Sequence, residues 1–508
     1  MTDFTELVDL AAERLGGAIL TANDEFFAEK ENLLKAAKPV FIDGKYTDRG
    51  KWMDGWETRR RRTEGHDWCI VRLGLPGRVR GVVVDTAFFR GNYPDHCSIE
   101  AASVPGQPSV DELLASGTTW TEILAKSKLE GDSANRFEID RDLRATHLRL
   151  HIYPDGGVAR LRVHGDVLPD PRWMGRAGAS VDLAAAEHGG LVLACNDMFF
   201  GSRHNLVMPG RSLNMGDGWE TKRSRGKGPD WVLLALAAEG TLERIEVDTL
   251  HFKGNAPESC AVSVIHAPGA TVADLTRKEA EWTEVLARTK LEPHTRHYFD
   301  ADVRVHPAAT HVRFRIWPDG GVSRLRLLGT VTREGREAFG VRRLNLLGPA
   351  DAERELRSCC GSAAWAQRMA MGRPFQNLAE MRVANAEVWA KLTPEDWQEA
   401  FRAHPRIGEK KADSTADASP MSRRWAEDEQ SEASSATRAT LDALVEVNKK
   451  YEAKFGHIYI VCATGKSAEE MLAIAEQRLG NDPASELGNA GDEQRKITDI
   501  RLHKLVHG

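Results

Sequence analysis

Residues 54–62 read D-G-W-E-T-R-R-R-R, and residues 217–225 repeat them as D-G-W-E-T-K-R-S-R. The same shift along the chain, within one residue, relates four further pairs of segments: 67–68 and 230–231, 84–92 and 247–255, 120–122 and 282–284, and 154–157 and 318–321. A period this long is far above the ~20–50 residues of solenoid repeats and propeller blades. The sequence therefore predicts that a whole domain has been duplicated.

The totals describe an ordinary globular chain. It has 508 residues, a formal net charge of −6 and 41% hydrophobic residues, which at ~150 residues per domain fits about three domains. The net charge argues against a generally basic nucleic-acid binder. The acidic N-terminus lacks the basic region of a secretory signal, and no stretch approaches the ~18 apolar residues of a membrane span. Seven cysteines without a C-x-x-C pair indicate a reducing compartment. We expect a cytoplasmic protein that binds neither nucleic acid nor membrane.

Alternation with a period of two predicts strands in both copies. In T-H-L-R-L-H-I-Y, residues 146–153, the apolar residues fall on one face, while His147, Arg149 and His151 fall on the other. The P-D-G-G that follows is a turn, and the chain then returns as a second strand. Short strands with Gly and Pro turns predict an all-β jelly roll or β-sandwich in each copy. We assign these two domains to residues 1–165 and 166–335.

Several segments are expected to depart from this pattern. Residues 1–14 predict a helical lead-in, 120–128 and 282–290 a helical insert in each copy, 34–51 an additional loop in the first copy, and 166–171 a proline-rich linker. Proline removes a backbone donor and favours extended backbone in the residue before it, which is typical of a linker.

The arginines after the repeated tryptophan differ in how well the duplication retains them. Arg60 and Arg62 reappear as Arg223 and Arg225, whereas the arginines between them change to lysine and serine. If residues 56–62 are extended, the retained arginines share the face of Trp56. A guanidinium group suits bidentate capture of a carboxylate, so these four arginines are candidate substrate ligands. A solvated basic strand or a nucleic-acid patch is the alternative interpretation.

Carboxylates and histidines retained in both copies are candidates for acid–base chemistry. The first pair is Glu57 and Glu220, each of which could act as a general base or hold an arginine. A second pair is His147 and His311, on the polar face of their strand, where a merely solvated side chain is the alternative. The repeated aspartates have structural alternatives: turn formation for 54 and 217 and for 155 and 319, and bonding to a loop backbone for 85 and 248.

These motifs resemble allantoicase. The similarity rests on D-G-W-E-T-R-R-R-R, on V-D-T-x-x-F-x-G-N-x-P in both copies and on P-D-G-G-V-x-R-L-R, and it covers nearly all of residues 15–330. The resemblance implies a pair of jelly-roll domains and hydrolysis of the small carboxylate allantoate to ureidoglycolate and urea. It assigns no catalytic residue. Whether a divalent metal takes part stays open, since no H-x-H or H-x-x-x-H spacing supports one.

The remainder of the chain changes to a helical pattern. A charged linker is expected at 330–341, followed by an all-α domain at 345–508. Thr393-Pro-Glu-Asp and Ser467-Ala-Glu-Glu are helix starts with an N-cap and acidic residues in the first turn. Residues 436–455 are amphipathic and end at Gly456, which is a C-terminal stop. Residues 412–422 are expected to form a loop, and 458–463 could be extended.

His404 opens the most informative stretch of this domain, H-P-R-I-G-E-K. The proline disfavours helical backbone in the residue before it, so the preceding helix must end here. Its dipole would then favour the protonated form of the histidine. A capping histidine is the alternative interpretation.

Three motifs of the helical domain resemble OHCU decarboxylase: residues 404–410, 425–431 and 455–467. That family converts 2-oxo-4-hydroxy-4-carboxy-5-ureidoimidazoline (OHCU) to S-allantoin. The resemblance implies no cofactor, an acid–base role for His404, a carboxylate partner in Glu429 that raises the pKa of the histidine, and a substrate amide contact for Gln430. Lys466 stands near the place where the family often has arginine, and Ala426 where it often has serine.

We therefore predict a bifunctional enzyme of purine catabolism with small-molecule substrates, and leave a homo-oligomeric state open. In the alternative reading, the β-sandwich pair is a non-catalytic module that binds small ligands such as carbohydrates, and the helical domain is an inactive oligomerisation unit.

Overall fold

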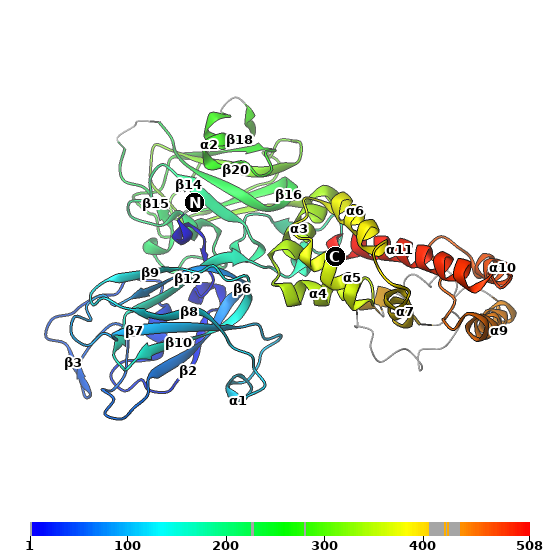
Figure 1. Cartoon of the computed structure of the whole chain (residues 1–508). Helices are drawn as coiled ribbons and strands as arrows, with labels where there is room; N and C mark the ends of the chain where they lie inside the picture. Colours follow the sequence, from blue (N-terminus) through cyan, green and yellow to red (C-terminus); the bar gives the residue numbers. More distant parts are fainter. Residues whose placement is uncertain are drawn as a thin grey trace. The chain divides into compact units, whose positions relative to one another are not determined.

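The structure is a computed structural model that describes residues 3–224, 228–278, 281–405, 421–422, 424–425 and 437–507. The chain forms two compact units, Met1–Arg336 and Glu337–Gly508 (Figure 1). The first unit consists of two β-sheet repeats and the second is helical.

Each repeat is built around one long strand. The first repeat has the strand order β1-β12-β6-β10-β7-β8, with β2 and β9 also paired to β6. Its elements are β1 (Val8–Asp9), β2 (Ala18–Ala22), β6 (Asp67–Asp85), β7 (His96–Ala102), α1 (Val110–Leu114), β8 (Thr121–Lys128), β9 (Ala134–Glu138), β10 (Arg144–Tyr153) and β12 (Arg160–Val167). The first half of β6 pairs with β2 and β10, and its second half with β9 and β12. The long strand thus joins the two layers of a sandwich.

The second repeat has the same topology, β13-β22-β16-β20-β17-β18, with β14 and β19 paired to the long strand β16. Its elements are β13 (Ser180–Asp182), β14 (Leu191–Cys195), β16 (Asp230–Asp248), β17 (Ser259–Ile265), α2 (Val272–Arg277), β18 (Thr283–Lys290), β19 (Arg296–Phe299), β20 (Ala309–Trp317) and β22 (Arg324–Val331). Identical topology in both halves confirms the predicted duplication and the predicted fold class.

Two-residue strands add a small sheet to each repeat. In the first repeat β5 (Trp56–Glu57) pairs with β11 (Gly157–Val158), and in the second β15 (Trp219–Glu220) pairs with β21 (Gly321–Val322). The hairpin of β3 (Tyr46–Thr47) and β4 (Gly50–Lys51) lies inside the additional loop expected in the first repeat.

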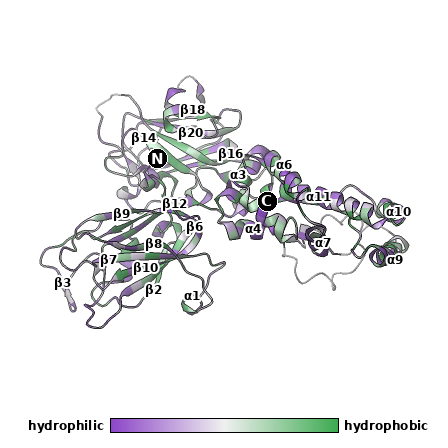
Figure 2. Ribbon diagram, in the orientation of Figure 1, coloured by the Kyte–Doolittle hydropathy of each residue, from purple (hydrophilic) through white to green (hydrophobic). Residues whose placement is uncertain are grey.

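The expected alternation holds along β10, where Leu148, Leu150 and Ile152 are fully buried. Hydrophobic residues gather along the strands of both sheets (Figure 2). The tight packing also explains the second glycine of P-D-G-G, because a Cβ on Gly157 would lie 2.0 Å from the ring of Phe89. The same holds for Gly321 and Phe252. The close approach of ring and backbone explains two repeated residues together: the second glycine of P-D-G-G and the phenylalanine of V-D-T-x-x-F.

The predicted helical inserts are wrong. Residues 121–128 and 283–290 form the strands β8 and β18, which pair with β7 and β17. The short helices α1 and α2 precede them, each started by a capping box. The predicted helical lead-in is also wrong, since the segment contains β1, which pairs with β12, and only a short 3-10 turn on either side of it. Pairing with a neighbouring strand decided both segments against their local helical composition.

The helical unit is built from α3 (Arg333–Leu346), α4 (Pro349–Arg357), α5 (Ala363–Met371), α6 (Leu378–Trp389), α7 (Pro394–Arg402), α9 (Arg438–Phe455), α10 (Ala468–Arg478) and α11 (Pro483–His507). The caps predicted at Thr393, Ser467 and Gly456 are confirmed.

The prediction of a charged linker at residues 330–341 is wrong, because β22 runs to Val331 and α3 begins at Arg333. Residues 458–463 form no strand, and most of the predicted loop 412–422 lies outside the described residues.

Six of the seven cysteines are buried, and Cys195 is partly exposed. None of the described helices is long and apolar enough to cross a membrane.

Candidate functional site

The repeated D-G-W-E-T motif folds in the same way in both repeats. Trp56 and Trp219 are fully buried, and each indole Nε1 donates a hydrogen bond of 2.8 Å to a backbone carbonyl, that of Asp24 or Asp197. The motif is therefore first of all a packing anchor that fixes the residues following it.

The aspartates of this motif form buried ion pairs. Asp54 Oδ2 lies 2.8 Å from Arg160 Nη2, and Asp217 Oδ1 lies 3.0 Å from Arg324 Nη2. Burial raises the pKa of Asp54, but hydrogen bonds from Arg160 and the Val40 amide outweigh it and leave the pKa below its ordinary value. These aspartates thus do more than form a turn: they tie the motif to the arginine after P-D-G-G.

The repeated glutamates are held by repeated asparagines. Asn92 Nδ2 donates to Glu57 Oε1 at 2.6 Å, and Asn255 Nδ2 donates to Glu220 Oε1 at 2.5 Å. Both glutamates are half-buried. Burial raises the pKa of Glu57, an effect that the hydrogen bond from Asn92 only partly offsets. Each repeat therefore holds one oriented carboxyl group of the kind that acid–base chemistry uses.

The arginines do not share the face of Trp56. The strand β5 ends at Glu57, and Arg60 and Arg62 are exposed while Trp56 is buried. Arg223 is exposed as well, and Arg225 lies outside the described residues. Instead, the neighbouring arginines form ion pairs: Arg59 Nη2 lies 2.6 Å from Asp24 Oδ2, and Arg61 Nη1 donates to Asp67 Oδ1 at 2.6 Å. The expected face was wrong because the chain leaves the sheet two residues after it enters; the role of the arginines stays a prediction.

His147 and His311 are buried, 2% and 6% exposed, instead of lying on a solvated face. Each Nδ1 lies 2.9 Å from the hydroxyl of the preceding threonine. Burial lowers the pKa of both histidines. They are therefore neutral side chains anchored within the fold, and their predicted catalytic role stays a prediction.

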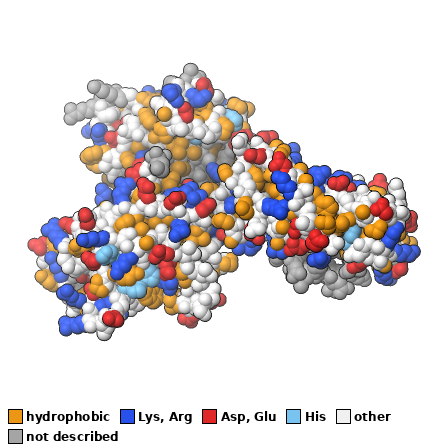
Figure 3. Space-filling view, viewed as in Figure 1, with side chains coloured by type: hydrophobic (Ala, Val, Ile, Leu, Met, Phe, Trp, Pro, Cys, Tyr) orange, Lys and Arg blue, Asp and Glu red, His pale blue; other side chains and the backbone are white. Residues whose placement is uncertain are grey.

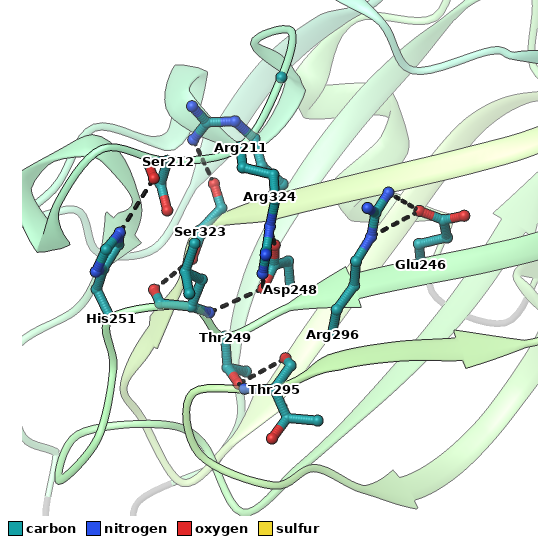
Figure 4. A network of polar contacts seen from close by, with 12 residues as sticks. Arg211, Ser212, Glu246, Asp248, Thr249, His251, Thr295, Arg296, Ser323 and Arg324 are labelled. Atoms are coloured by element: carbon teal, nitrogen blue, oxygen red, sulfur yellow. Dashed lines mark hydrogen bonds and ion pairs between the residues drawn. The ribbon is translucent and has the colours of Figure 1, made fainter.

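The V-D-T motif holds a loop, as its alternative interpretation expected. Asp85 and Asp248 each accept a hydrogen bond from the amide two residues further on. In the second repeat Thr249 donates to the Thr295 carbonyl, and Asp248 also pairs with Arg211 (Figure 4). The same view shows Arg296 against Glu246 on the neighbouring strands. These charges neutralise one another, which is typical of a structural network.

A polar pocket of about 570 Å³ opens on the first repeat. Its lining includes Arg61, His66, Glu100, Arg149, His151 and Tyr153. The alternation of residues 146–153 places Arg149 and His151 on this face of β10, but His66, Glu100 and His151 have no counterpart in the second repeat and so are not among the retained candidates. A search for histidines and carboxylates present in one repeat alone would have found them.

His404 follows α7, as predicted, and its amide donates to the Phe401 carbonyl. His404 is half-buried, with its Nε2 shielded from solvent, and burial together with the nearby Arg501 lowers its pKa to about 3. This direction is opposite to the one expected from the helix dipole, because burial penalises the charged form more than the dipole favours it.

Glu429 and Gln430 lie outside the described residues. Lys466 is half-buried, and its Nζ donates to the Cys462 carbonyl at 2.7 Å.

Among the residues that the structure describes, no three His, Cys, Asp or Glu side chains are grouped as a metal site requires. The divalent metal considered for the β repeats stays a prediction.

Two duplicated β-sandwiches, each with a carboxyl group held by an asparagine, and a helical unit with a half-buried imidazole define a multidomain architecture. The allantoicase repeat family matches residues 8–168 and 181–332, more than half of the chain. The chain belongs to the allantoicase family. Residues 345–503 match the OHCU decarboxylase family.

Known relatives agree with this assignment. Allantoicase from Dictyostelium discoideum is 49% identical over 64% of this chain and 87% of its own length. A probable allantoicase from Streptomyces avermitilis is 46% identical over 68% of this chain and 91% of its own length. The crystal structure of Saccharomyces cerevisiae allantoicase is 35% identical, covers 64% of this chain and 93% of that one, and has a TM-score of 0.55. This chain is thus an enzyme of purine catabolism with a hydrolase part and a decarboxylase part.

Proposed function

We propose that the β repeats hydrolyse allantoate to ureidoglycolate and urea, and that the helical unit decarboxylates OHCU to S-allantoin. The family matches of both parts support this pair of reactions, and they disfavour the reading as a non-catalytic ligand-binding module. The observation that carries the hydrolase half is the carboxyl group held by an asparagine in each repeat, Glu57 by Asn92 and Glu220 by Asn255.

Release of urea from allantoate needs a group that can exchange a proton near neutral pH. Glu57 fits this role, since burial raises its pKa toward the working range. The substrate also carries a carboxylate. Arg60, Arg62 and Arg223 are exposed and form no ion pair with the described residues, so their guanidinium groups are available to hold it.

The hydrolase half is tested by measuring urea release from allantoate with the full chain. We expect Glu57→Gln to lower kcat, and the double variant Glu57→Gln/Glu220→Gln to lose it. Dialysis against a chelator, followed by adding back Mn²⁺ or Mg²⁺, tests the divalent metal. A wild-type chain that releases no urea with or without these metals would refute the hydrolase.

In the decarboxylase half, His404 would accept the proton from the substrate hydroxyl, CO₂ would leave, and the remaining anion would be protonated on one face. The lowered pKa of His404 keeps its imidazole neutral, and a charged Glu429 beside it would raise its affinity for the proton. We propose Glu429 as its partner and Gln430 and Lys466 as substrate contacts. No cofactor is required, since the imidazoline ring can hold the negative charge.

The decarboxylase half is tested by following the optical rotation of the allantoin formed from fresh OHCU. His404→Asn should abolish the excess of one enantiomer, while the far-UV circular dichroism stays unchanged. An unchanged excess would refute the assignment. A homo-oligomeric state and a cytoplasmic location stay predictions, which sedimentation and cell fractionation would test.

A further inference from the structure

Glu100, His151 and His66 form a connected chain of side chains in the pocket of the first repeat. His151 Nε2 lies 2.9 Å from Glu100 Oε2, and His151 Nδ1 lies 2.9 Å from His66 Nε2. Arg149 Nε also donates to Glu100 Oε2, at 2.7 Å. The carboxylate is thus held from two sides and fixes one end of the chain.

The number of donors and acceptors on each side chain decides which atom donates in each hydrogen bond between Glu100, His151 and His66. Hydrogen bonds from His151 and Arg149 outweigh burial and hold the pKa of Glu100 below its ordinary value, so its carboxylate accepts. Nε2 of His151 must therefore donate, which leaves Nδ1 of the neutral ring as an acceptor. Nε2 of His66 must then donate to it. Nδ1 of His66 keeps a lone pair and has no hydrogen-bond partner among the described residues.

The second repeat has lost this arrangement. The sheet register places Arg315 where the first repeat has His151, since both pair with the repeated tryptophan of the long strand. The same register places Ser263 at the position of Glu100, and the sequence has Pro229 at the position of His66. Arg315 Nη2 instead donates to Ser263 Oγ. The chain of imidazoles therefore belongs to one repeat alone.

The pocket is open to a charged ligand. Figure 3 shows histidines gathered beside Lys and Arg side chains on this face, over the strands β7 and β10. Arg61 lines the pocket, and Lys126 Nζ lies 4.4 Å from the centre of the Tyr153 ring. Against these cations stand Asp67, which pairs with Arg61, and Glu122 on the rim. A small organic carboxylate would find both a cationic edge and an acceptor nitrogen here.

We propose that His66 is the general base that activates water for ureide hydrolysis, and that His151 and Glu100 are positioning residues. This inference rests on the proposed hydrolysis of allantoate, and it places that chemistry in the first repeat. Nδ1 of His66 accepts a proton from water as the water oxygen bonds to the carbon between the two ureido groups. The bond from this carbon to one ureido nitrogen breaks, and the same proton passes to that nitrogen, so urea leaves neutral. Glu100 stabilises the positive charge that develops on the imidazole pair.

The full chain is assayed for urea release from allantoate. His66→Asn should lower kcat by about 100-fold or more, as expected for loss of a general base, and imidazole added to His66→Ala should restore part of the rate. Glu100→Gln should lower kcat more than it changes KM. It should also move the acidic limb of the kcat–pH profile to lower pH, because the imidazole pair loses the charge that stabilises its protonated form.

The matched control is His266→Gln in the second repeat, where His266 Nε2 also contacts a glutamate, Glu239, at 3.0 Å. It should behave as the wild type. Unchanged kcat in His66→Asn, or an unmoved pH profile in Glu100→Gln, would overturn the proposal while urea release by the wild type still upheld the hydrolase. A wild type that releases no urea would overturn both. Equal melting temperatures of all variants would show that each has folded.

Discussion

Residues retained by both repeats turn out to serve two purposes. The pair of Asp54 and Arg160, like that of Asp217 and Arg324, is buried and connects two repeated motifs. The pair of Glu57 and Asn92 lies nearer the surface, with Glu57 half-buried and Asn92 exposed, and it holds a carboxyl group in one orientation. The fact that a residue is retained in both repeats does not tell a structural residue from a candidate site residue, because the fold and the site both restrict which residue a position accepts.

The first prediction concerns the buried ion pair. Asp54→Asn leaves the guanidinium of Arg160, 2% exposed, without its counter-charge, and breaking such a pair costs about 3–5 kcal/mol. We expect a large loss in the free energy of unfolding of the β unit, measured by urea denaturation. Asp170→Asn removes the partner of the exposed Arg172 and should leave stability unchanged. Equal stabilities of both variants would contradict the importance of burial.

The second prediction concerns His404, whose pKa is lowered to about 3 by burial. An unfolded histidine binds its proton at about pH 6.5. Between these two values the unfolded chain holds more protons, so this group's stabilisation is present above the unfolded pKa and is lost as pH falls. The loss approaches about 1.4 kcal/mol per pH unit for one proton.

His404→Gln should flatten the fall in the denaturation midpoint of the helical unit between pH 6.5 and pH 4.5. The control His266→Gln should keep the wild-type slope. A wild-type slope in His404→Gln would mean that other groups cause the acid sensitivity.

Elements with strong local signals could be predicted from the sequence. The helices α7 and α10 begin at their predicted caps, α9 ends at its predicted Gly456, and β10 follows its alternation. The strands β8 and β18 could not be predicted, because T-E-I-L-A-K-S-K favours a helix and only pairing with β7 decides the outcome. For the same reason the pocket around His66 could not be predicted: four strands and a loop bring its residues together, and no local spacing records this.

The third prediction tests a cap. Thr393 closes the capping box of α7, the helix that ends just before His404. Thr393→Ala should destabilise the helical unit by about 1 kcal/mol, the ordinary cost of losing an N-cap. Thr393→Ser keeps the accepting oxygen and should lie near the wild type. Calorimetric melting of the full chain measures both, and equal melting points would contradict the cap's contribution.

At the scale of the whole molecule, the two compact units carry separate chemistry. Their candidate residues belong to different units and to different substrates, so substitutions in one should not affect the other.

The fourth prediction concerns the independence of the two activities. Glu57→Gln should lower urea release and leave the decarboxylation of OHCU within about twofold, since sites that share no partner residues are additive within a few tenths of a kcal/mol. His404→Asn should do the reverse. A loss of both activities in either variant would show that the units depend on one another.

Because most of the cysteines are buried, the reactivity of their thiols measures local unfolding of the chain. Burial raises the pKa of Cys97, Cys260 and Cys360 to about 12 and that of the partly exposed Cys195 to about 11, and a protonated thiol is a poor nucleophile. An alkylating reagent should therefore modify the native enzyme slowly, and at Cys195 first. Since the other thiols lie in both units, mass spectrometry of alkylated peptides would record which half of the enzyme loosens first during heating.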